Sequence, residues 1–232
     1  MRQPVAALAI VAVVVICFSA TACNTGHRRS SSDAKPTSRT MVPRPLVPRE
    51  LPALLLSPQE VGAAMGLPAM TVTGTEDAMA DNSATMAPKE CLAIDGAAEA
   101  AVYADSGLSG ARDQTLHDGD KFTKYVKQAV VVFPTVEQAR AFFDGSAKNW
   151  PACHEYTHTQ SKTQWSPGPV SNEKGILSLI TNQRDAAAPG WSCGRALALR
   201  NNVIVDVNTC AADPGDSAYK IAEQIGAKVT SR

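Results

Sequence analysis

The strongest constraint on the fold of this chain is a pair of β-prone runs on either side of Asn201-Asn202, within the segment Trp191–Cys210. Asparagine tolerates the positive φ angles that a two-residue type I′ turn requires at both central positions, so the segment predicts a β-hairpin. The turn fixes the register, which places Cys193 opposite Cys210 in a non-hydrogen-bonded pair. Cα atoms in such pairs are about 4.5 Å apart, which is within disulfide range. We therefore predict a disulfide-closed hairpin in an oxidising compartment.

The two remaining cysteines of the domain, Cys91 and Cys153, then form the second predicted disulfide. Two other pairings of the four cysteines are formally possible, and the hairpin register is the reason to reject them. Both bridges would stabilise the domain by restricting its unfolded chain.

A secretory signal is predicted at the N-terminus. Arg2 is followed by the apolar run Val5–Phe18 and then by small residues, a pattern typical of a signal peptide over residues 1–22. The residues leading to Cys23 resemble a bacterial lipobox, in which this cysteine carries a thioether-linked diacylglycerol and becomes the mature N-terminus. The alternatives are ordinary cleavage that leaves a free Cys23, or an uncleaved anchor.

The rest of the chain has two parts that differ in composition and net charge. Residues 23–50 are rich in Ser, Thr and Pro and carry six basic residues against two acidic ones, which predicts a flexible tether near anionic lipid head groups or a generic solvated linker. Residues 51–232 carry 15 basic and 20 acidic residues, a net charge of −5. This mildly acidic part is long enough for one domain with a hydrophobic core, and its charge argues against nucleic acid as a partner.

Local patterns within the domain predict an α+β fold. Capping signals and amphipathic stripes predict helices over residues 57–66, 135–149 and 217–228. Val-rich and alternating runs predict strands over residues 98–103, 125–133, 155–165 and 176–183, besides the hairpin. Residues 71–88 and 106–119 are predicted to be loops, apart from an edge strand near residues 70–73. The expected architecture is an antiparallel sheet of four to six strands, with two or three helices packed on one face and two disulfides.

One motif could carry catalysis. His154, Glu155 and His158 match H-E-x-x-H, in which two His ligate zinc and the Glu activates water. That chemistry requires a helix, because residues four apart then lie on one face. Here Pro151 precedes the motif and the residues within it are β-prone, and on a strand the two His would lie about 13 Å apart. We expect polar strand residues, and keep a zinc metallohydrolase as the alternative.

No other pattern predicts catalytic residues, a cofactor or a metal. The sequence has no Gly-x-Ser-x-Gly nucleophile motif and no Gly-rich phosphate loop. Asp113, Asp118 and Asp120 cluster with His117, but their spacing fits no EF-hand, so a solvated loop is the better interpretation. Trp165 is the candidate for an exposed aromatic platform that contacts a ligand.

Specific matches to a known family occur at Trp150–Cys153, Cys193–Leu197, Arg200–Val207 and Cys210. There the chain resembles the PknH-like extracellular domain family, the extracytoplasmic sensor domain of a mycobacterial Ser/Thr kinase that also occurs in stand-alone mycobacterial lipoproteins. The resemblance covers Leu51 to the C-terminus. It implies an antiparallel sheet with packed helices, four cysteines that map onto those of the domain, and a ligand-binding cleft. It does not extend to the receptor's kinase domain or transmembrane helix, so we expect no phosphorylation by this chain itself.

These observations favour a lipoprotein at the outer face of the cytoplasmic membrane, in the mycobacterial cell envelope. We expect a non-catalytic, sensor-like module that binds a small molecule, a glycan or a protein, and no nucleic acid. The alternatives are the zinc hydrolase and a purely structural envelope protein without a pocket. The predicted organisation is a signal peptide over residues 1–22, a lipidated cysteine and tether over 23–50, and the sensor domain over 51–232.

Overall fold

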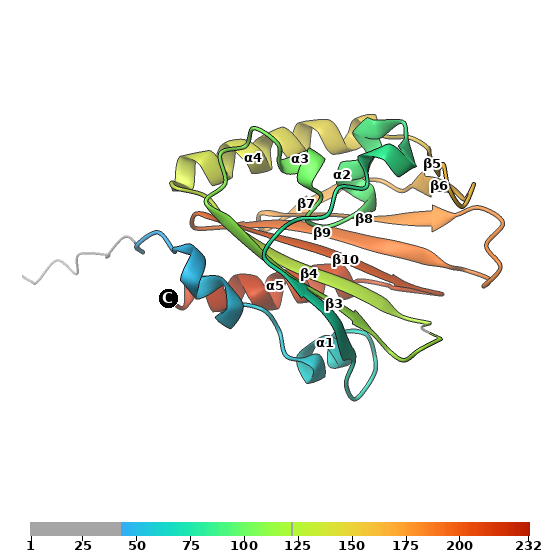
Figure 1. Cartoon of the computed structure of the whole chain (residues 1–232), viewed down its shortest axis with the longest axis horizontal. Helices are drawn as coiled ribbons and strands as arrows, with labels where there is room; N and C mark the ends of the chain where they lie inside the picture. The colour runs from blue at the N-terminus through green and yellow to red at the C-terminus, as the bar shows by residue number, and fades with distance from the viewer. Residues whose placement is uncertain (1–42, 122) are drawn as a thin grey trace, which may run out of the picture. The chain divides into compact units, whose positions relative to one another are not determined.

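The computed structural model describes residues 43–121 and 123–232, so the predicted signal peptide, Cys23 and most of the predicted tether lie outside the described residues. The described chain forms one sheet of ten strands, paired antiparallel, with helices on both faces (Figure 1). The strand order across the sheet is β1-β3-β4-β10-β9-β8-β6-β5-β2, and β7 pairs with β8 outside this path.

The strands are β1 Thr71–Glu76, β2 Met86–Ala87, β3 Gly110–His117, β4 Tyr125–Val132, β5 Tyr156–His158, β6 Gln164–Pro167, β7 Ser171–Glu173, β8 Ile176–Gln183, β9 Ser192–Arg200 and β10 Val203–Ala211. The α-helices are α1 Pro58–Ala64, α2 Leu92–Asp95, α3 Ala100–Tyr103, α4 Val136–Asn149 and α5 Ser217–Thr230. Short 3-10 helices are η1 Pro48–Ala53, η2 Ser83–Thr85, η3 Lys89–Cys91 and η4 Trp150–Ala152.

Both faces of the sheet are covered because its central strands are apolar on both sides. Every residue of β10 is buried, and its alternate apolar side chains belong to two separate core clusters. Helix α5 lies on one face of the sheet, and α4 with the α2–α3 segment lies on the other (Figure 1). The predicted α+β class with two disulfides is confirmed. The sheet has more strands than the four to six expected, and helices cover two faces instead of one.

The region between residues 98 and 119 differs most from the prediction. Residues 100–103, expected in a strand, form the short helix α3, and the expected loop over 106–119 contains β3. The sequence of β3 is polar and contains glycine, so it has little strand character of its own. It is a strand because it pairs along its whole length with the apolar β4. Pairing and burial override local propensity in this way.

The predicted hairpin register is confirmed. β9 and β10 pair so that Cys193 faces Cys210, with Cα atoms 4.1 Å apart, and the two cysteines form a disulfide. The other predicted disulfide, Cys91–Cys153, is also present. The turn is not type I′, because only Asn201 has a positive φ, +52°. A positive φ at the first central residue alone is the pattern of a type II′ turn.

Asn202, the second residue of the turn, is buried, and its side chain contacts two other segments of the chain. Its side-chain amide accepts a hydrogen bond from the Leu46 N–H at 2.8 Å and donates to the carbonyl oxygens of Leu46 at 2.9 Å and Phe133 at 2.7 Å. Leu46 is itself buried, at 3% exposure. The folded domain therefore begins before the predicted boundary at Leu51, because the turn of the hairpin holds the segment that leads into η1.

Two predicted helix starts are capped as their sequences indicate. The Ser57 hydroxyl accepts a hydrogen bond from the Glu60 N–H at the start of α1, and the Thr135 hydroxyl accepts one from the Gln138 N–H at the start of α4. Each satisfies a backbone donor that the first helical turn leaves without a partner. None of the helices in the described ranges has the length and apolar character needed to span a bilayer.

Replacing Asn202 by Ala should lower the free energy of unfolding by about 3 kcal/mol, because buried backbone groups of two segments lose their partner. Urea titration followed by far-UV circular dichroism, with both disulfides intact, measures the loss. The control is Asn201→Gly, which suits the positive φ and removes only an exposed hydrogen bond to the Arg44 carbonyl. Its cost should stay below about 1 kcal/mol, and equal losses in the two variants would contradict the role of Asn202.

Candidate functional site

A groove of about 610 Å³ lies between the sheet and the first turn of α5. Its floor is formed by β8 together with Gly194 of β9. One wall is formed by residues 215–219 at the start of α5, and the other by Gly168, Pro169 and β7. This size is within the range of small-ligand sites, about 300–1,000 Å³.

The floor is open because α5 packs over β9 and β10 and leaves part of β8 uncovered. Ser178, Ile180 and Asn182 alternate along β8, so their side chains point to the same face, toward the groove. Ser178 and Ile180 are half-buried and Asn182 is exposed. A strand surface that would normally be covered by a helix is thus presented to solvent.

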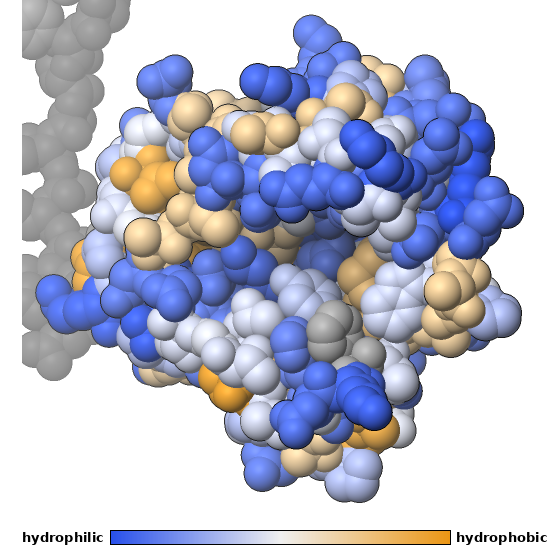
Figure 2. Space-filling model, turned by 45° about the vertical axis from the view of Figure 1, so that its right-hand side comes forward, coloured by the Kyte–Doolittle hydropathy of each residue, from blue (hydrophilic) through white to orange (hydrophobic). Residues whose placement is uncertain are grey.

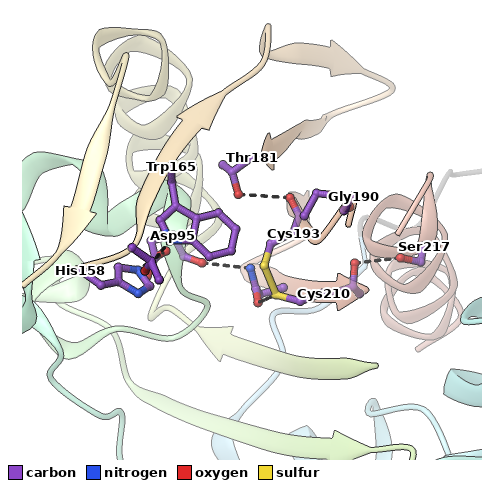
Figure 3. The surroundings of a disulfide bond; sticks show 12 residues. Asp95, His158, Trp165, Thr181, Gly190, Cys193, Cys210 and Ser217 are labelled. Atoms are coloured by element: carbon purple, nitrogen blue, oxygen red, sulfur yellow. Dashed lines mark hydrogen bonds and ion pairs between the residues drawn. A yellow bond between two sulfur atoms is a disulfide. The ribbon is translucent and has the colours of Figure 1, made fainter. Parts of the chain in front are cut away.

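Gly194 sets the distance between α5 and the sheet. A Cβ atom at this position would lie 3.0 Å from Thr209 Oγ1 and 3.3 Å from Ala218 Cβ, so a larger residue would displace the start of the helix. The hydroxyl groups of Thr209 and Ser217 are 2.8 Å apart and join α5 to β10; Figure 3 shows Ser217 in this contact. Close packing and a buried hydrogen bond therefore fix this wall of the groove.

The groove contains neutral polar groups that are available to a ligand. Within the described part of the chain, the side chains of Ser178, Asn182 and Tyr219 make no hydrogen bond. Two carboxylates, Glu173 and Asp216, also line it. The arrangement offers directional hydrogen bonds around an apolar floor, as small-molecule sites do.

The residue after Gly194 on β9 is Arg195, whose side chain turns to the opposite face of the sheet. Its Nη1 lies 2.6 Å from Asp206 Oδ1, and both side chains are 2% exposed. The same nitrogen donates to the Val207 carbonyl at 2.7 Å, and Nη2 donates to the Ala93 carbonyl at 2.8 Å. These hydrogen bonds offset part of the cost of removing two charges from water.

Asp206 uses its second oxygen to hold the segment that carries α2 and α3. Oδ2 accepts hydrogen bonds from the Ala98 N–H and the Tyr103 hydroxyl, each at 2.9 Å. Burial, together with the Asp206 carboxylate, raises the pKa of Tyr103, so its hydroxyl remains a donor. The Trp150 ring lies beside Arg195, with its centroid 5.3 Å from the guanidinium carbon. This buried network fastens residues 93–103 to the sheet face opposite the groove.

Asp95 and His158 add a less buried contact to the same segment. His158 Nε2 lies 2.9 Å from Asp95 Oδ1, and the Asp95 carbonyl accepts a hydrogen bond from the Asn208 amide at 2.9 Å (Figure 3). The hydrogen bond with Asp95 raises the pKa of His158, and burial opposes this effect. The protonated imidazole and the carboxylate form an ion pair that links β5 to α2.

The residues of the H-E-x-x-H motif are not brought together. His158 lies on β5 and contacts Asp95, Glu155 pairs with Arg184, and His154 is exposed before the strand. The zinc alternative required a helix over residues 153–159, where the structure has no helix and residues 156–158 form β5. Across residues 43–121 and 123–232, no three His, Cys, Asp or Glu side chains are grouped to hold a metal ion.

Trp165 is not the exposed platform that was expected. It is 5% exposed, and its ring stacks on Tyr156 with centroids 6.1 Å apart. Its Nε1 donates to Thr163 Oγ1 at 3.1 Å. The reason is the position of β6, which lies between β5 and β8 in the sheet, so the indole fills the core beside the hairpin disulfide (Figure 3).

The predicted acidic loop is partly a strand. Asp113 lies on β3 at 4% exposure, with its carboxylate 3.5 Å from Lys127 Nζ, and burial raises the pKa of Asp113 despite the nearby ammonium. Asp118 accepts hydrogen bonds from the Thr123 N–H and hydroxyl and closes the turn before β4. Both carboxylates are thus used in structural contacts.

Sequence reasoning did not identify the groove. Alternation over residues 176–183 indicates that Ser178, Ile180 and Asn182 share a face, but it does not indicate that α5 leaves that face open. A second cavity of about 610 Å³ lies beside the Cys91–Cys153 disulfide. Half of its lining residues are aliphatic, and its polar side chains are those of Ser83, Lys89, Glu90 and Asn149. The groove presents more polar side chains, so it is the better candidate site.

Comparison with known proteins identifies related domains. The family described as the PknH-like extracellular domain matches residues 46–228. Serine/threonine-protein kinase PknH of Mycobacterium tuberculosis (strain CDC 1551 / Oshkosh) is 34% identical over 192 residues, which are 81% of this chain and 30% of the kinase. PknH of Mycobacterium bovis is also 34% identical over 192 residues, 81% of this chain and 32% of that protein. The chain thus spans about a third of the length of these curated relatives.

A solved structure shows the same fold. The crystal structure of the extracellular domain of PknH from Mycobacterium tuberculosis matches with a TM-score of 0.76 at 32% sequence identity. The match covers 82% of this chain and 99% of that one. The described domain therefore corresponds to the whole of that extracellular domain.

Asp206→Asn should destabilise the domain by roughly 3–5 kcal/mol, because it leaves the buried Arg195 guanidinium without its counter-charge. The unfolding free energy from urea titration measures the loss, and hydrogen exchange should show that residues 93–103 lose protection first. The matched control is Asp77→Asn, which breaks the exposed ion pair with Arg112, where Asp77 is 77% exposed. That change should cost less than about 1 kcal/mol. Similar losses in both variants would contradict the fastening role of the buried pair.

The ion pair of His158 with Asp95 should make stability depend on pH. Because the pKa of His158 is raised in the folded state, its contribution is complete below the unfolded value of about 6.5 and is lost as the pH rises through the folded pKa. The difference in unfolding free energy between the unmodified protein and His158→Gln should therefore shrink over this range. His154→Gln, at an exposed His, should keep the pH profile of the unmodified protein, and a flat difference curve for His158→Gln would refute the assignment.

Proposed function

The chain belongs to the PknH-like extracellular domain family, and on this premise we propose that it is a lipid-anchored, non-catalytic, sensor-like module that binds a ligand in the mycobacterial cell envelope. Its place is the outer face of the cytoplasmic membrane. Residues 1–22 are removed as the signal peptide, Cys23 carries the lipid, and a tether leads to a domain that begins near Leu46.

The observation that carries the ligand-binding proposal is the groove beside α5. It combines an apolar floor with the unpartnered side chains of Ser178, Asn182 and Tyr219. Polar groups without partners lose hydrogen bonds to water when an apolar surface covers them, so a ligand must replace these bonds to bind. A surface that had only a structural role would not need to keep three such groups around a cavity of this size.

Binding is a better interpretation of the groove than catalysis. A serine nucleophile needs a base within hydrogen-bond reach, and the Ser178 hydroxyl has no hydrogen-bond partner among the described residues. The carboxylates Glu173 and Asp216 lie at the edge of the groove in exposed positions, where they can orient a ligand. We propose that the chain captures or presents its ligand, or modulates a membrane partner.

The anchor follows from the N-terminal sequence. A diacylglycerol on Cys23 supplies two acyl chains, and two chains hold a protein stably at a membrane where one does not. Basic residues of the tether would add attraction to anionic head groups at the same surface. The two disulfides of the domain are compatible with this oxidising location.

Membrane fractionation and native mass spectrometry of the full chain test the proposal together. We expect the protein in the membrane fraction, with a mass that includes diacylglycerol and two disulfides. Cys23→Ser should lose both the lipid mass and the membrane association, whereas Cys17→Ser, within the signal segment, should retain them. An organic species retained by the protein should be lost from the groove variant Tyr219→Ala. Equal membrane association of the two cysteine variants, without lipid mass, would refute the anchor.

A further inference from the structure

We propose that the groove beside α5 binds a neutral oligosaccharide of at least two sugar rings. This inference rests on the proposed ligand-binding function and specifies its ligand class. Three properties of the groove carry it: its charge balance, the kind of hydrogen-bonding groups that it leaves unpartnered, and the way these groups are spaced along β8.

The charged side chains of the groove disfavour an anionic ligand. No basic side chain points into it, because the Arg195 guanidinium is buried on the opposite face of the sheet with Asp206. Recognition of phosphate or carboxylate relies on Arg, Lys or clustered N–H donors. An anionic ligand would instead meet the carboxylates of Glu173 and Asp216.

One of these carboxylates already has a cationic partner, which weakens the attraction of the groove for a positively charged ligand. Lys220 Nζ lies 2.7 Å from Asp216 Oδ1 in an exposed ion pair. Glu173 accepts a hydrogen bond from the Ser171 hydroxyl at 3.3 Å and is followed in sequence by Lys174. Each carboxylate can still accept a hydrogen bond from a hydroxyl group, and Asp216 is the one of the two that is held in an ion pair.

The unpartnered side chains both donate and accept hydrogen bonds. Ser178 and Tyr219 carry hydroxyl groups and Asn182 carries an amide, and each of these groups has donor and acceptor atoms. A sugar hydroxyl has the same dual character, whereas a phosphate only accepts and an ammonium only donates. A ligand with several hydroxyl groups is therefore the best match for all three.

The floor between these groups is apolar. Ile180 lies between Ser178 and Asn182 on β8, and Ala218 and the half-buried Tyr219 ring face it from α5. The C–H face of a sugar ring packs on such a surface while its hydroxyl groups remain at the rim. Ser178 and Asn182 are four residues apart on a strand, about 13 Å along its axis, which is longer than one pyranose ring. A ligand that reaches both must contain at least two rings.

Saturation-transfer NMR with the full chain in detergent, both disulfides intact, tests the proposal with three trisaccharides of different charge. The probes are maltotriose, which is neutral, 3′-sialyllactose, which is anionic, and the glucosamine trimer of chitosan, which is cationic. We expect transfer to the ring protons of maltotriose and little to the other two. Asn182→Ala and Tyr219→Ala should each weaken maltotriose binding about tenfold, the effect of one lost hydrogen bond or ring contact.

The matched control is Gln183→Ala. Gln183 follows Asn182 on β8, but its side chain is directed to the opposite face of the sheet. This variant should bind maltotriose like the unmodified protein. Preferential binding of the charged trimers, sensitive to Asn182→Ala, would overturn the neutral ligand and leave the groove as a binding site. Maltotriose binding that is insensitive to both groove variants would overturn the assigned site. No binding of any probe, together with no retained ligand in native mass spectrometry, would overturn the inference and the ligand-binding function together.

Discussion

The structure depends most on the buried ion pair of Arg195 and Asp206. Both side chains are almost inaccessible to water, so the pair is tolerable only because every oxygen of the carboxylate and both terminal nitrogens of the guanidinium have partners. Several of those partners belong to residues 93–103, which are far from the hairpin in sequence. The charges thus stabilise the association of this segment with the sheet, and the segment in turn keeps the charges dry.

The hairpin strand β9 connects this network to the candidate site. Cys193, Gly194 and Arg195 are consecutive, and strand geometry sends their side chains to alternate faces. On one face lie the disulfide and the buried charge; on the other, the absence of a side chain at Gly194 lets α5 approach the sheet. The same three residues therefore fasten one helical layer and shape the groove beneath the other. A change in the hairpin would affect both faces together.

This arrangement explains how a sensor-like domain can combine a rigid frame with an open site. The central strands are covered on both faces, and one disulfide joins β9 to β10, while the site lies where α5 leaves β8 uncovered. The surface in Figure 2 carries hydrophilic and hydrophobic residues intermixed, without one dominant apolar area in that view. The relationship to PknH extends over the whole extracellular domain, so the frame belongs to the family.

The sequence by itself determined what depends on neighbours along the chain. It specified the hairpin register and hence both disulfides, and it located the caps of α1 and α4, because turn geometry and capping act over a few residues. It also predicted the α+β class. Tertiary structure alone decided that β3 is a strand, that Asn202 holds Leu46, that Trp165 is buried and that helices cover two faces. It also decided the candidate site, because a groove exists only where one element stops short of another. These outcomes depend on contacts between residues that are distant in sequence, which no local pattern encodes.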